Sequence, residues 1–77
     1  MTDTERLLAG HQRLLAIVAN QSYTSVADGA LNVALFADEP IRITATHHHK
    51  NHAEFDGATL SECLDRFEAW LTRMETP

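Results

Sequence analysis

The stretch of residues 59–74 constrains the fold of this chain more than any other. An α-helix turns by about 100° per residue. At that spacing five apolar residues share one face, namely Leu60, Leu64, Phe67, Leu71 and Met74. Cys63 and Trp70 flank this face. Thr59 and Glu62 have the spacing of a capping box, in which side chains bind free backbone amides at the start of a helix. We therefore predict an amphipathic helix whose apolar face is covered by the rest of the chain.

A second amphipathic helix is predicted over residues 4–19. Its apolar residues on one face are Leu7, Leu8, Leu14, Leu15 and Val18. Thr2 and Glu5 repeat the capping-box spacing. Gly10 weakens the helix by roughly 1 kcal/mol relative to alanine, so we expect another element to approach it closely. His11 lies in the apolar arc, where we expect a histidine at the edge of the core, bonded to a backbone carbonyl, rather than a buried base.

Three strands are predicted between the helices. Residues 31–37 and 41–47 alternate between apolar and polar side chains, and the turn Asp38-Glu39-Pro40 joins them into an antiparallel hairpin. Residues 52–56 form a short third strand that Gly57 ends. Residues 23–26 have strand-like composition, which leaves open a further edge strand. Phe36 is the one large aromatic on the polar face of the hairpin.

These elements predict an α+β fold in the order helix, three antiparallel strands, helix. Both helices should lie on one face of the sheet, because only one face of the hairpin is apolar. The chain has no linker, internal repeat or low-complexity tract, so we predict one domain over residues 1–77.

This order of elements resembles that of double-stranded-RNA-binding domains over nearly the whole chain. That family carries a basic cluster at the start of its last helix. The same position here reads Thr59-Leu60-Ser61-Glu62, with Asp65 after it and no lysine. Because Glu62 and Asp65 would repel phosphate, the resemblance is one of topology, and RNA binding is not expected.

The charge of the chain excludes several other partners. Its net charge is −5, with 6 Lys and Arg residues against 11 Asp and Glu residues. Direct nucleic-acid binding needs clustered Lys and Arg residues, and binding to an anionic membrane surface needs them as well. Neither partner is therefore expected. A basic protein remains a fitting partner, including one that normally binds nucleic acid. The single cysteine, an acidic N-terminus without a signal-peptide pattern and the lack of a long apolar stretch predict a cytoplasmic protein.

The histidine-rich stretch 47–52 is the least usual local feature. His47 and His49 would share a strand face, and His52 could fold back towards them across the turn. Imidazole is a common ligand of transition metals and titrates near neutral pH. A metal-binding or pH-responsive domain is therefore the alternative function. The spacing matches no established zinc pattern, so we predict a polar hairpin tip with neither metal nor cofactor.

No motif indicates catalysis. The chain lacks a glycine-rich phosphate loop, a nucleophile elbow and an H-E-x-x-H pair. Cys63, at the edge of an apolar stripe, is expected to be a small core residue rather than a nucleophile. An enzyme is the hypothesis with the least support, and we predict that the protein is not one.

Two groups of residues are candidates for contact with a partner. Asp65, Glu68 and Glu75 form an acidic surface on the last predicted helix, which could steer a basic partner. Neutralising them should then slow association and leave the fold intact. Phe36 and Trp70 are large aromatics at the borders of their buried faces, where such residues commonly anchor interfaces.

The sequence therefore favours a non-enzymatic protein-binding module. Its size, acidity and lack of catalytic motifs resemble those of anti-CRISPR and other anti-defence proteins, the small inhibitors and adaptors that phages and mobile elements carry. That resemblance implies steric block, or charge mimicry of nucleic acid, on a basic surface of the target. A chain of 77 residues buries only a modest core, so a homodimer is also compatible with the sequence.

Overall fold

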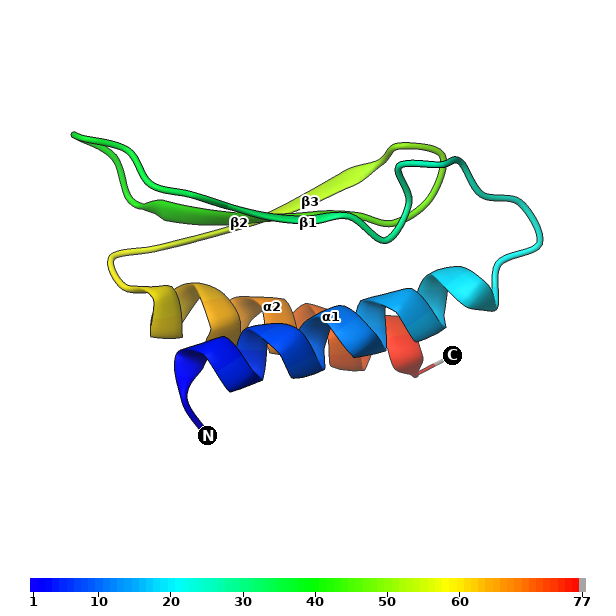
Figure 1. Cartoon of the computed structure of the whole chain (residues 1–77), viewed down its shortest axis with the longest axis horizontal. Coiled ribbons are helices and arrows are strands. Elements are labelled where there is room, and N and C mark those ends of the chain that lie inside the picture. Colours follow the sequence, from blue (N-terminus) through cyan, green and yellow to red (C-terminus); the bar gives the residue numbers. More distant parts are fainter. Residues whose placement is uncertain (77) are drawn as a thin grey trace.

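The structure is a computed structural model that describes residues 1–76; Pro77 lies outside the described residues. Its elements, in chain order (Figure 1), are α1 (Asp3–Ala19), β1 (Leu31–Ala34), β2 (Ile41–Thr46), β3 (His52–Gly57) and α2 (Leu60–Glu75). The predicted order of one helix, three strands and one helix is confirmed.

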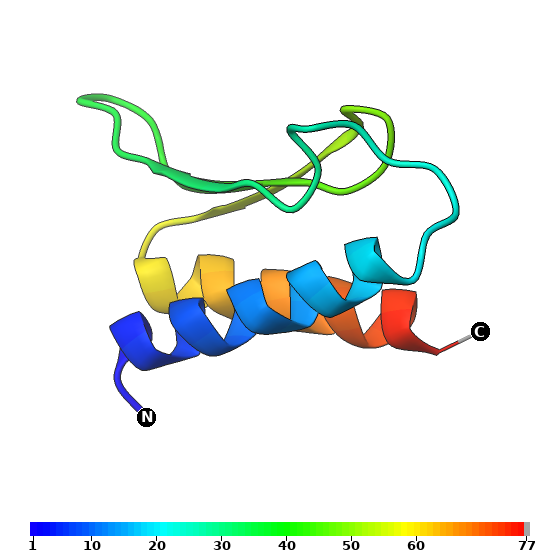
Figure 2. The same cartoon turned by 45° about the vertical axis from the view of Figure 1, so that its right-hand side comes forward.

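The three strands form an antiparallel sheet in the order β1-β2-β3. Val33 of β1 lies opposite Ile43 of β2, which lies opposite Phe55 of β3. This row faces the helices, because Ile43 and Phe55 belong to the buried core. Two views of the molecule show both helices beneath the same face of the sheet (Figures 1 and 2). The other face carries no helix within residues 1–76.

Side chains from α2 and the sheet form most of the core. Its buried members are Leu14, Ile43, Ala45, Phe55, Cys63, Leu64, Phe67 and Leu71. The core position expected for Cys63 is confirmed. Met74 is exposed, although its place in the apolar stripe predicted burial. It lies in the last turn of α2, beside an open hollow between the C-terminal ends of the helices. Thr59 caps α2 by accepting a hydrogen bond from the Glu62 amide (3.2 Å).

α1 packs against α2 through a glycine. A Cβ atom at Gly10 would lie 2.6 Å from Cε2 of Phe67, so only glycine lets the two helices approach this closely. The close approach predicted at Gly10 is therefore confirmed. Beside it, His11 donates from Nε2 to the Gly29 carbonyl (2.9 Å). This bond confirms His11 as a residue at the edge of the core.

The structure corrects the predicted length of the first strand and decides the question of an edge strand at residues 23–26. β1 ends at Ala34 instead of continuing to residue 37. The reason is that Pro40, which would sit opposite the continuing strand, has no N–H for the ladder. Residues 23–26 form no strand. Their segment closes into a turn, because Asp28 accepts hydrogen bonds from both the amide and the hydroxyl of Ser25.

Candidate functional site

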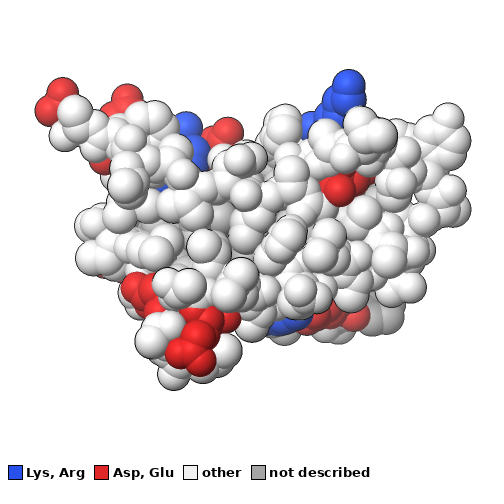
Figure 3. Space-filling view, in the orientation of Figure 1, with Lys and Arg blue, Asp and Glu red and all other residues white. Residues whose placement is uncertain are grey.

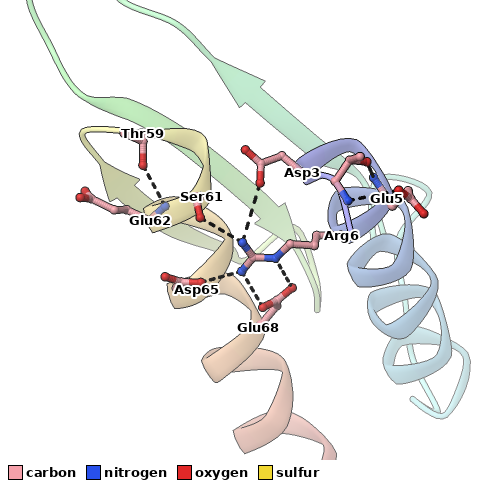
Figure 4. Close-up of polar contacts among 9 residues, drawn as sticks. Asp3, Glu5, Arg6, Thr59, Ser61, Glu62, Asp65 and Glu68 are labelled. Atoms are coloured by element: carbon pink, nitrogen blue, oxygen red, sulfur yellow. Dashed lines mark hydrogen bonds and ion pairs between the residues drawn. The ribbon is translucent and has the colours of Figure 1, made fainter.

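The acidic residues predicted to meet a partner are paired with arginines of α1. Arg6 donates to both carboxylate oxygens of Glu68 (3.1 and 2.8 Å), to Asp65 (2.6 Å) and to the Ser61 hydroxyl (3.1 Å). Figure 4 shows the Arg6 guanidinium pointing from α1 into this group of α2 side chains. The hydrogen bonds with Glu68 and then Asp65 raise the pKa of Arg6 well above its usual value. The Arg6 charge is thus offset at the junction of the helices.

The same arrangement recurs two turns further along both helices. Arg13 donates to both oxygens of Glu75 (3.0 and 2.5 Å), and this pairing lowers the pKa of the Glu75 carboxyl. Asp65, Glu68 and Glu75 therefore link the two helices. Their role in steering a partner stays a prediction. Neutralising them would also remove hydrogen bonds between the helices, so a binding test with these variants needs a parallel measurement of stability.

The histidine candidates for a metal site do not converge. β2 ends at Thr46, so the strand alternation that would align His47 with His49 stops too early. The His47 ring packs edge-on against Trp70, with the ring centres 5.3 Å apart. His52 is hydrogen-bonded through Nδ1 to the Thr46 hydroxyl (3.0 Å). Among the described residues, no three His, Cys, Asp or Glu side chains come together as ligands of a metal ion.

Asp28 organises the histidine-rich turn. Besides Ser25, its carboxylate accepts hydrogen bonds from the backbone amides of His49 and Lys50, each at 3.1 Å. Both residues have left-handed backbone conformations, with φ of 50° and 66°. The hydrogen bond from the Ser25 amide leads the interactions that lower the pKa of Asp28 to about 2. One carboxylate therefore ties the segment after α1 to the turn between β2 and β3.

Acid should release this tie. The Asp28 carboxyl has a pKa of about 2 in the folded chain and an ordinary value of 3.8, so the folded state binds fewer protons. Its contribution to stability is complete well above pH 3.8 and is lost as the pH falls towards 2. Thermal melts between pH 7 and pH 2 should show this loss. Asp28→Asn should lower the melting temperature at pH 7 and flatten the profile below pH 4.

Asp38→Asn is the matched control, because Asp38 lies exposed in the other hairpin turn. It should keep the wild-type melting temperature at pH 7. If Asp28→Asn has the same melting temperature as the wild type at pH 7, the hydrogen bonds of the Asp28 carboxylate do not stabilise the fold.

The two aromatic candidates lie in different environments. Trp70 is half-buried, and its ring packs against Phe55 and Phe67, with centres 5.6 and 6.4 Å apart. Phe36 is 43 % exposed, and its ring centre lies 5.8 Å from the guanidinium carbon of Arg42. Phe36 is therefore the aromatic that is available to a partner without disturbing the core.

The sheet face around Phe36 is polar, and no helix of residues 1–76 covers it. Arg42 lies on this face, since it alternates with the buried Ile43. It donates through Nε to Asp56 of β3 (2.7 Å) and lies 3.6 Å from Glu54. We call Phe36, Arg42, Glu54 and Asp56 the outer sheet surface. An exposed aromatic beside a cation and two carboxylates is suited to contact with a protein surface.

No protein-family model, curated protein or solved structure matches this chain. Its function must be inferred from its own side chains. Neither helix of residues 1–76 has the length and the hydropathy that crossing a membrane requires.

The remaining chemical groups are engaged in structure. The buried Cys63 thiol donates to the Ile41 carbonyl (3.1 Å), and burial raises its pKa, which suppresses the reactive thiolate. An open hollow of about 220 Å³ lies between the C-terminal ends of the helices, beside Ile17, Asn20 and Met74. It is smaller than a typical small-molecule pocket of about 300–1,000 Å³.

Sequence reasoning missed the arginines, although the signal was present. Arg6 and Arg13 lie seven residues apart, as do Glu68 and Glu75. Side chains seven residues apart share a helix face. When the two helices lie side by side and parallel, the two arginines therefore come opposite the two glutamates. The link from Asp28 to the histidine-rich turn had no comparable signal, because those partners are backbone amides of His49 and Lys50, far along the chain.

Proposed function

We propose that this protein is a non-enzymatic protein-binding module that contacts its partner through the outer sheet surface. The exposed Phe36 ring on the sheet face without a helix carries the proposal. A large aromatic that is partly exposed beside Arg42 can bury much area on binding at little conformational cost. A small anti-defence inhibitor or adaptor, of the kind that phages and mobile elements carry, is the concrete form of this function. The proposed site of action is the cytoplasm, which suits a chain whose one cysteine is a thiol.

Steric block is the form of inhibition that the side chains support better than charge mimicry. A mimic of nucleic acid needs carboxylates that are free to meet cations of the target. Glu68 and Glu75 already pair with arginines of α1, and Asp56 pairs with Arg42. The exposed carboxylates of Asp38 and Glu39, in the hairpin after Phe36, remain to steer a basic partner.

Replacing Phe36 with alanine should weaken binding mainly through faster dissociation. A desolvated aromatic anchor contributes about 2–4 kcal/mol once the complex has formed. The partner would be captured from a cell lysate with the immobilised protein and identified by mass spectrometry. Surface plasmon resonance at two salt concentrations would then separate the two rates, with the association rate alone expected to fall steeply with salt.

Tyr23→Ala is the matched control, because Tyr23 is also an exposed aromatic but packs against His49 in the turn between β2 and β3, at the other end of β2 from Phe36. It should leave both rates unchanged. If Phe36→Ala behaves like Tyr23→Ala, while a nucleic acid or a small molecule binds the wild type, the protein-binding module is the wrong class.

A further inference from the structure

The helix-facing side of β1 is covered at Leu31, which packs against the core, and is open from Val33 onwards. In the row Val33, Ile43, Phe55, exposure is 40 % at Val33 but only 0 % and 7 % at the other two residues. α2 packs under β2 and β3, whereas the contacts of either helix with β1 are few. Leu35, which follows β1, is 77 % exposed. Apolar side chains on the buried face of the sheet thus reach solvent at one edge.

α1 extends this apolar area. Leu8 and Leu15 are exposed by 62 % and 39 %, and they lie seven residues apart on one side of the helix. Leu15 adjoins the start of β1, since a Cβ atom at Gly29 would lie 2.9 Å from its Cδ2. We call Leu8, Leu15, Val33 and Leu35 the β1 face. In Figure 3, the middle of the side of the molecule on which α1 and β1 lie is free of charged residues, which gather at its rim. Charge depletion and apolar exposure mark the centre of interfaces.

The backbone of β1 is also open. β1 is an edge strand, and within residues 1–76 it pairs with β2 alone. The Thr46 amide donates to the Ala30 carbonyl (3.0 Å). Paired groups recur at every second residue of an antiparallel ladder, so the backbone groups of Leu31 and Val33 point to the open edge.

The other edge of the sheet is protected. Arg66 of α2 donates to the Asp56 carbonyl of β3, and β3 carries two acidic side chains, Glu54 and Asp56. Natural sheets block edges with charged side chains of this kind. β1, whose sequence is Leu-Asn-Val-Ala, has no charged residue and no proline. The two edges therefore differ in their capacity to accept another strand.

We propose that the β1 face is a dimer interface, in which β1 pairs with β1 of a second copy of this chain to form a continuous six-stranded antiparallel sheet. Apolar residues at positions 31, 33 and 35 are symmetric about Val33. An antiparallel twofold axis at Val33 places Val33 opposite its own copy and Leu31 opposite Leu35 of the second copy. Such a self-complementary strand is what an isologous interface requires.

Charge also favours a second copy. Each chain carries a net charge of −5, so two copies repel unless they meet where charge is absent. The β1 face is that place. The pairing leaves the outer sheet surface of each chain open. The dimer then carries two outer sheet surfaces on one continuous sheet, which would make partner binding bivalent. The dimer itself does not depend on the proposed partner.

Sedimentation velocity over a range of concentrations tests the proposal. The wild type should reach twice the chain mass, and Val33→Lys should raise the dimer dissociation constant at least about 30-fold, as loss of an interface hot spot does. Val26→Lys is the matched control, because Val26 is fully exposed and lies outside the β1 face. It should remain dimeric. Position 35 lies outside the strands of the single chain, so Leu35→Lys should not disturb the fold. It should still dissociate the dimer, which keeps the test valid if Val33→Lys unfolds the chain.

Hydrogen exchange provides the second readout. The amides of Leu31 and Val33 should be protected in the wild type at high protein concentration and exposed in Leu35→Lys. A wild type that stays monomeric up to about 1 mM, a concentration at which even a dimer with a millimolar dissociation constant would be detected, would overturn the proposal. The open edge of β1 would then be a site for an extended segment of another protein. A dimer whose β1 amides exchange freely, or one that survives Leu35→Lys, would also overturn it.

Discussion

Phe67→Ala is expected to lower the free energy of unfolding by about 3–5 kcal/mol, the range seen for a fully buried phenylalanine. Phe67 is 0 % exposed and is the largest fully buried side chain. It contacts α1 at Gly10, and its ring lies 5.5 Å from that of Phe55. The truncation would leave a cavity at the junction of both helices and the sheet. A chain of 77 residues has a total stability of only about 4–12 kcal/mol, so most of the folded population could be lost at 37 °C.

Urea denaturation followed by circular dichroism measures this effect. Phe36→Ala is the control, because it makes the same change at an exposed ring and should shift the stability by about 0.5 kcal/mol or less. Equal midpoints for Phe67→Ala and Phe36→Ala would show that the helix junction is not the centre of the core.

Gly10→Val should also destabilise the chain, by about 1–3 kcal/mol, as overpacking of a well-packed site does. The first added carbon would lie 2.6 Å from Phe67, and the two methyl groups would need further space. Valine is a better helix former than glycine by only a few tenths of a kcal/mol, which offsets little of this cost. The expected result is a lower urea midpoint with α1 pushed away from α2.

Two variants make the Gly10 prediction specific. Ala9→Val adds bulk to the same helix at an exposed position and should change the stability far less. Combining Gly10→Val with Phe67→Leu should cost less than the sum of the two single changes, because a smaller side chain opens space for the valine. Strict additivity would mean that the two residues do not meet.

The helices were predictable because their signals are local. Caps, apolar stripes and the small residue at Gly10 all act within a few residues along the chain. The length of β1 was not predicted, since it depends on which residue lies opposite Pro40. The end of the second strand was predicted one residue too late, at His47, for a similar reason. The strand ends at Thr46 and the backbone beyond it is bound by Asp28, a residue more than twenty positions earlier. The acidic candidates look free in sequence because their arginine partners are 59 to 62 residues away.

That separation has a consequence for how the protein is made. β2, β3 and α2 follow one another along the chain, so their contacts can form soon after each is synthesised. α1 is synthesised first, but Gly10 packs against α2, and Arg6 and Arg13 form their hydrogen bonds with carboxylates of α2, the last element. At about 5–20 residues per second, a ribosome needs roughly 3–12 s to add those 62 residues. During that time the apolar stripe of α1 has no partner helix and is open to a chaperone. The length of this window is set by the position of α2 in the chain and not by the sequence of α1.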